Sequence, residues 1–236
     1  SLAWIIEYKR VDFDDADGKT AAAYFARGNG TKEDPYVLNA PIHLYNLAWL
    51  QYLGVFNNKV NADNSNQYYF SIESDLDMNN YSLPPIGTTK YPFIGNFNGN
   101  NKTITNLTVS NIISSDTSAK EISKKPLAVG DTLNDVNIIG LFGVVGDLNN
   151  VVGTYDSSVN EVKNLGIENI DVHARTSSTL IGIAAGYVNG TIDNIKIIGN
   201  NRLDTSTVST NPIATLSNNL SDYSLVGYCT DKYKSF

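Results

Sequence analysis

Apolar residues along most of the chain occur in short runs that alternate with polar residues, and Asn, Gly or Pro separates one run from the next. Alternation of this kind is typical of β-strands that bury one face. Short β-type runs occur at residues 68–72, 83–87 and 93–99, and the last run contains the strong turn signal Asn98-Gly99. The pattern predicts an all-β fold.

One stretch near the N-terminus follows a helical period instead. Its apolar and aromatic side chains recur at intervals of three and four residues. Asn39 is placed to cap a helix, Pro41 suits a first turn, and Gly54 ends the pattern. We therefore predict an amphipathic helix at residues 41–53 that plugs the open end of the sheet core.

A seven-residue pattern with a central asparagine recurs along the chain, with one apolar residue two positions before the Asn and two apolar residues after it. The copies are 103–109 around Asn106, 161–167 around Asn164 and 191–197 around Asn194. In a straight strand, alternation would place these apolar residues on opposite faces. Asn tolerates the left-handed conformation better than other non-glycine residues, so a bend at each Asn can return them to one side.

Strands that bend in this way form the corners of a coiled sheet, whose turns stack about 4.8 Å apart. Asparagines at equivalent corners can then exchange amide hydrogen bonds, and we predict one structural ladder through Asn106, Asn164 and Asn194. The predicted architecture is a parallel β-helix (solenoid) with one N-terminal capping α-helix. An ordinary β-sandwich with Asn in its turns is the alternative.

A glycine-containing run supports the coiled arrangement. Residues 139–146 are echoed by 181–188 and again by 225–228, with spacings of 42 from Gly140 to Gly182 and of 45 from Gly182 to Gly227. We interpret each spacing as two coils of roughly 20 residues, within the range of solenoid repeats. No helix follows these glycines, so close strand approach explains them better than dinucleotide binding.

These patterns divide the chain into three regions. We predict an N-terminal extension at 1–27, a cap with the helix at 28–66, and parallel β-helix coils at 67–236. Polar segments at 111–135 and 147–160 are expected to be inserted loops. Since the last residues contain no cap or anchor motif, we expect the chain to be truncated at its C-terminus.

Composition narrows the classes of partner. The net charge is −7 and only 17% of residues are charged, without the clustered Lys and Arg that nucleic-acid binding requires. No apolar run approaches the ~20 residues needed to cross a bilayer, so we expect no membrane insertion in this segment. Cys229 is the single cysteine, which excludes an intrachain disulfide and is compatible with export from a bacterium.

An acidic cluster before Gly18 invites a calcium interpretation; it consists of Asp12, Asp14, Asp15 and Asp17. The register of an EF-hand loop fails because its first ligand position would be Phe13. A solvated acidic loop is the alternative, and calcium binding here stays open.

Two aspartates and two histidines are the polar residues that could carry catalytic chemistry. Asp75 and Asp77 are two positions apart and resemble the paired carboxylates of glycosidases, although a structural role is the favoured interpretation. His43 and His173 have no Ser or Cys in a nucleophile context. We therefore predict no catalytic, cofactor-binding or metal-binding residues.

Several motifs follow one another between residues 24 and 200: Gly28-Asn29-Gly30-Thr31, Asp34-Pro35-Tyr36, Leu44-Tyr45-Asn46-Leu47-Ala48, Ser74-Asp75-Leu76-Asp77-Met78, Pro85-Ile86-Gly87, residues 93–104, and Gly140-Leu141-Phe142-Gly143. In this combination and order they resemble the GLUG-type repeat regions of bacterial cell-surface proteins. The resemblance implies the right-handed, pectin-lyase-like parallel β-helix, in adhesin-like proteins and in the non-catalytic part of IgA-protease-like proteins. The second copy, Gly182-Ile183-Ala184-Ala185, departs from the pattern because it lacks the Phe.

The expected function is a non-catalytic adhesin or ligand-binding module, extracellular or on the bacterial cell surface. Its partner would be a host or cell-surface protein or a glycan, and self-association is a further expectation. The alternatives are a carbohydrate-active β-helix enzyme, which would be a polysaccharide lyase or glycoside hydrolase, and a structural spacer or self-assembling surface protein.

Overall fold

The computed structural model describes residues 24–58, 67–110, 133, 136–146, 160–173, 180–204 and 226–229. The two helices are α2 (Pro41–Tyr52) and α3 (Val55–Asn58), and the strands are β1 (Tyr36–Leu38), β2 (Tyr69–Ile72), β3 (Leu76–Leu83), β4 (Asn96–Ser110), β5 (Ile138–Ile139), β6 (Phe142–Val145), β7 (Glu161–His173), β8 (Leu180–Ile181), β9 (Ala185–Val188), β10 (Thr191–Ile198), β11 (Arg202–Asp204) and β12 (Val226–Cys229). The all-β prediction is confirmed. Most of the predicted extension at 1–27 and of the predicted insertions at 111–135 and 147–160 lies outside the described residues.

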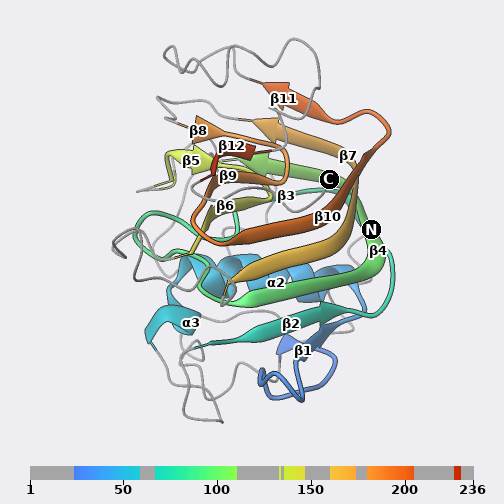
Figure 1. Ribbon diagram of the computed structural model, residues 1–236. Coiled ribbons are helices and arrows are strands. Elements are labelled where there is room, and N and C mark those ends of the chain that lie inside the picture. Colours follow the sequence, from blue (N-terminus) through green and yellow to red (C-terminus); the bar gives the residue numbers. More distant parts are fainter. Residues whose placement is uncertain are drawn as a thin grey trace.

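The strands form three parallel sheets (Figure 1). The largest has the order β1-β2-β4-β7-β10, with β3 also paired to β4 and β11 also paired to β7. A second sheet has the order β12-β9-β6, and a third pairs β5 with β8. Figure 1 shows β2, β4, β7 and β10 as successive layers that run in the same direction. After β4 and again after β7, the chain passes through the β5–β8 sheet and then the β6–β9 sheet before it returns.

The long strands bend at asparagines in the left-handed conformation. In β4, β7 and β10 the predicted residues Asn106, Asn164 and Asn194 have φ of 57°, 54° and 52°. The bends turn the apolar residues on both sides of each Asn to one interior, where Ile104 and Val109 are fully buried. The predicted bend at each of these three asparagines is confirmed.

The three asparagines do not form one ladder, however. Asn164 and Asn194 meet at one corner, where the Asn194 Nδ2 donates to the Asn164 Oδ1 at 2.8 Å. The strand register places Asn106 at a second corner, opposite Asn169. There the Asn106 Nδ2 donates to the Asp77 Oδ1 at 3.1 Å. The prediction is corrected to two corners, because β7 bends twice and residues 166–172 also match the repeated pattern.

The glycine spacings also need correction. β6 pairs directly with β9, Phe142 opposite Ala185, so the spacing between these copies is one circuit of the chain and not two. β12 follows on β9 with Tyr228 opposite Tyr187, which places Gly227 beside Gly186 rather than Gly182. The expected role of the glycines in close strand approach holds at Gly143, where an added Cβ would lie 2.2 Å from the Gly87 carbonyl oxygen.

The helix α2 contacts β1 and β3 at the N-terminal end of the large sheet. Its N-cap is Ala40 and not the expected Asn39. The predicted amphipathic character is wrong, because every residue from Ile42 to Gln51 is buried. A cluster of aromatic rings continues this core, and burial raises the pKa of one of them, Tyr36, to about 12.

Candidate functional site

Two rows of polar side chains cross the outer face of the large sheet. The strand register aligns Tyr69, Asn96, Glu161 and Thr191 in one row and Ser71, Asn98, Lys163 and Asp193 in the other. The residues between the rows are the apolar positions of the same strands, and they point into the core. The rows arise because alternation sends every second side chain outward and parallel pairing repeats this at each strand.

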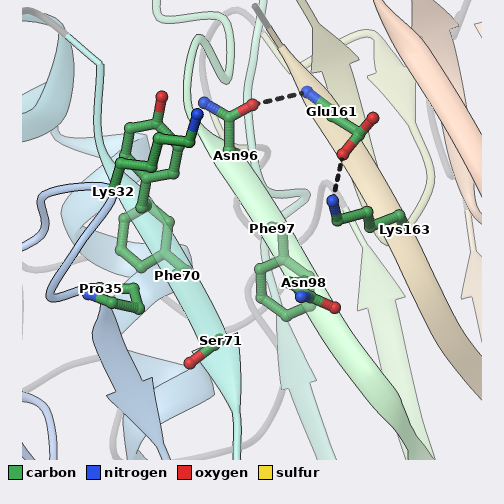
Figure 2. A pocket seen from close by; sticks show the side chains of 10 residues that line it. Lys32, Pro35, Phe70, Ser71, Asn96, Phe97, Asn98, Glu161 and Lys163 are labelled. Atoms are coloured by element: carbon green, nitrogen blue, oxygen red, sulfur yellow. Dashed lines mark hydrogen bonds and ion pairs between the residues drawn. The ribbon is translucent and has the colours of Figure 1, made fainter. Parts of the chain in front are cut away.

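A pocket of about 320 Å³ opens over these rows. It is lined by Lys32, Pro35, Tyr69, Phe70, Ser71, Asn96, Phe97, Asn98, Glu161 and Lys163. Figure 2 shows Lys32 and Pro35 on one side, Glu161 and Lys163 on the other, and the two asparagines between them. The floor is rigid since it consists of paired strands.

The wall that carries Lys32 is a turn held by its own polar groups. The amide nitrogens of Asn29 and Gly30 both donate to the Asp34 carbonyl oxygen at 3.0 Å. The Asn29 Oδ1 accepts from the backbone nitrogen and hydroxyl of Thr31. The backbone nitrogen of Tyr69 donates to the Gly30 carbonyl oxygen at 2.9 Å, which fixes the turn to β2. The wall is therefore positioned by the first strand of the pocket floor.

Some charged and hydrogen-bonding groups of the pocket have a partner within the protein, and others have none. The Lys163 Nζ lies 2.7 Å from the Glu161 Oε1, and their side chains are 38% and 22% exposed. The Asn96 Oδ1 accepts from the Glu161 backbone nitrogen at 3.2 Å, but the Asn96 Nδ2 is buried without a hydrogen-bond partner. Lys32 forms no ion pair with any residue that the structure describes. The arrangement can bind a polar ligand.

The acids singled out from the sequence lie elsewhere. The Asp75 Oδ1 accepts from the backbone nitrogen of Thr103 at 2.9 Å, and the Asp77 Oδ1 accepts from the backbone nitrogen of Asn79 at 2.9 Å. Asp77 of β3, through its bond from Asn106, and Asp75, directly before β3, connect this part of the chain to β4. Both carboxylates are absent from the pocket lining.

Of the two histidines, His43 has a structural position. Its side chain is 1% exposed, and its Nδ1 accepts from the backbone nitrogens of Asn39 at 3.1 Å and Ala40 at 3.2 Å. Burial lowers the pKa of His43 to about 4. His173 ends β7, paired with Ser110.

The remaining sequence candidates are not placed. The acidic cluster Asp12, Asp14, Asp15 and Asp17 and the side chain of Cys229 lie outside what the structure describes. Among the described residues, no group of three or more His, Cys, Asp or Glu side chains could hold a metal ion. No helix among them is long and apolar enough to span a membrane.

Sequence reasoning missed the pocket residues. Asn96, Glu161 and Lys163 occupy polar positions of strands, where such residues are common. A signal was present in the alignment of the repeats, since 161–163 precede Asn164 just as 191–193 precede Asn194. Aligning these two copies of the repeat places Glu161 opposite Thr191 and Lys163 opposite Asp193, which would have indicated the two polar rows.

Part of a longer known protein is similar in sequence to this chain. No family model matches the chain, so the resemblance to GLUG-type regions stays a prediction. A protein of Evansella cellulosilytica named "Putative Gly-rich membrane protein" is 28% identical over 186 residues, covering 76% of this chain and 16% of that protein. The chain thus spans about one sixth of the relative's length.

Part of a solved structure also superposes on the chain. It is a "putative immunoglobulin A1 protease" from Bacteroides ovatus, which superposes with a TM-score of 0.48 and 21% sequence identity over 78% of this chain and 43% of that chain.

Proposed function

We propose that the chain is a non-catalytic, ligand-binding segment of a bacterial surface or exported protein, folded as a right-handed parallel β-helix. The fold part of the proposal is supported by the exclusively parallel pairing of the named strands. It is further supported by the repeated path through three sheets and by the asparagine bends. A coil of this kind is stiff, so it presents surface groups in fixed positions.

The pocket over the outer face of β2, β4 and β7 is the observation that carries the binding function. Apart from Lys32, its polar groups stand on paired strands and lose little entropy when a ligand binds. The unpartnered Asn96 Nδ2 and the unpaired Lys32 offer contacts that the protein itself does not use. A buried donor without a partner in a native structure calls for an explanation, and a ligand supplies one.

The surface location is supported by the relative of Evansella cellulosilytica, which is named a membrane protein and of which the chain covers 16%. An adhesin or ligand-binding module repeated or combined with other segments would suit such a protein. Its partner would be a host or cell-surface protein or a glycan.

A blocking substitution tests the proposal. A panel of glycans and purified surface proteins is first screened for ligands of the unmodified chain. Ser71→Trp places an indole in the pocket and should abolish binding, whereas Thr108→Trp, on the outer face but outside the pocket lining, should leave it unchanged. A panel without any ligand, or equal binding by both variants, would refute the function proposed.

A further inference from the structure

The unused groups of the pocket are mostly donors. The Asn96 amide has a defined orientation because its Oδ1 accepts from the Glu161 backbone, which leaves the Nδ2 as the free group. Figure 2 shows this nitrogen turned to the side of Lys32. The Asn98 Oδ1 already accepts from the Asn100 backbone at 3.0 Å and from the Asn164 Nδ2 at 3.3 Å. A fitting ligand therefore supplies acceptors.

The charged residues that line the pocket are two lysines and one glutamate, although the chain as a whole has a net charge of −7. Glu161 neutralises Lys163 through their 2.7 Å contact, and the ammonium of Lys32 is left over. Charge-assisted hydrogen bonds from a Lys and an amide are strongest to an ionised acceptor. An acidic group between Lys32 and the Asn96 Nδ2 satisfies both donors at once.

The shape of the face favours a saccharide over an acidic peptide. An extended peptide gains most of its affinity by pairing its backbone with a sheet edge. Here the floor strands β2, β4 and β7 are already paired, so their backbone groups are used. Amide, hydroxyl and charged side chains instead repeat at the strand spacing of about 4.8 Å, which is comparable to the length of one sugar ring.

Resting on the proposed function, we infer that the pocket binds an acidic oligosaccharide, with a carboxylate or sulfate held between Lys32 and Asn96. The neighbouring sugar hydroxyls lie along the two rows, which begin with Tyr69 and Ser71 on β2. The rows continue beyond the pocket to Thr191 and Asp193 on β10, so a ligand of several sugar rings fits better than a monosaccharide.

The test compares three tetrasaccharides of one backbone by calorimetric titration: a uronate, its carboxyl-reduced neutral form, and the neutral form bearing sulfate esters. We expect the preferred acidic form to bind at least roughly tenfold more tightly than the neutral one. Asn96→Asp keeps the acceptor for Glu161 but replaces the donor, and Lys32→Gln removes the charge. Each should abolish the preference for acid, while Lys196→Gln on the exposed part of β10 should keep it.

Several results would overturn the inference. These are equal affinity for the acidic and neutral forms, no binding of either acidic form, tighter binding of a glutamate tetrapeptide, or unchanged binding by Asn96→Asp and Lys32→Gln. A neutral ligand lost with Ser71→Trp would overturn only the acidic class and leave the proposed binding function intact. Unaltered binding by Ser71→Trp would instead remove the pocket from both.

Discussion

Asn164 bends strand β7 through its backbone and links neighbouring strands through its side-chain amide. Its backbone adopts φ of 54° at the first bend of β7, and its amide accepts from Asn194 and donates to Asn98. A non-glycine residue without a short polar side chain is strained in that conformation. The bend and the amide bonds can be separated by substitution.

Asn164→Ala should lower the free energy of unfolding by about 2–3 kcal/mol, the sum of left-handed strain and lost hydrogen bonds. Asn164→Gly relieves the strain and loses only the bonds, so it should be about 1 kcal/mol more stable than the alanine variant. Urea unfolding followed by circular dichroism measures both. Equal stability of the two variants would contradict the assignment of a strained bend.

His43 makes stability depend on pH. The pKa of His43 is about 4 in the folded chain and 6.5 for an ordinary histidine, so the unfolded state binds the proton more readily. The contribution of neutral, buried His43 to the free energy of unfolding is fully present above pH 6.5 and is lost as the pH falls toward 4. Between pH 7 and pH 5 this amounts to about 2 kcal/mol.

His43→Gln is the matched variant, because Gln at this position can accept the same backbone hydrogen without titrating. The difference in unfolding free energy between pH 7 and pH 5 should be about 2 kcal/mol smaller in the variant than in the unmodified chain. Parallel pH profiles of the two proteins would show that His43 is not buried as described.

The residues that bend the strands were predictable, since few residue types tolerate positive φ. Which asparagines share a corner was not predictable, because residues 166–172 fit the same pattern as 103–109. Only the pairing of β4 with β7 shows that Asn106 lies opposite Asn169 and not at the corner of Asn164. Lys32 lies in none of the motifs, and the motif at 93–104 that contains Asn96 did not indicate binding. Their importance follows from which strand and turn lie beside them.

At the scale of elements, glycines set how closely the strands approach. Gly143 of β6 faces the carbonyl oxygen of Gly87, and its backbone nitrogen donates to the Ile86 carbonyl oxygen at 3.0 Å. A side chain at this position meets backbone, which cannot rotate away. The run 139–146 therefore depends on small residues for its pairing.

Gly143→Ala should reduce the free energy of unfolding by about 1–3 kcal/mol through overpacking. Gly166→Ala is the comparison, because its nearest obstacle is the Thr103 hydroxyl oxygen, 2.6 Å from the added Cβ, which belongs to a side chain and can rotate away. Thermal unfolding should rank Gly143→Ala below Gly166→Ala. The reverse order would contradict the close contact between β6 and the 86–87 segment.

The helix α2 was predictable in position, and its burial was not. An amphipathic helix turns its polar residues to water, yet the Asn46 Nδ2 donates to the Tyr24 carbonyl oxygen and the Gln51 Nε2 to the Tyr91 carbonyl oxygen. Segments distant in sequence thus cover the side expected to face water. Local periodicity contains no information about such coverage.

At the scale of the whole molecule, strand register creates the candidate site. Alternation sends Ser71, Asn98 and Lys163 outward, but only parallel pairing without slippage brings them side by side. A slip of one residue would send the polar rows inward and the apolar core outward. A change of register would therefore disrupt both the core and the binding surface.

Disulfide trapping tests this register most directly. In a Cys229→Ser background, Lys163→Cys is combined with Asp193→Cys, its partner in register, or with Thr191→Cys, the partner of Glu161. In-register positions on adjacent strands lie within disulfide range, whereas diagonal positions are about 7–8 Å apart. Mass spectrometry after mild oxidation should find the 163–193 bond in nearly all molecules and the 163–191 bond in few. Preferential formation of the 163–191 bond would contradict the parallel register and the pocket built on it.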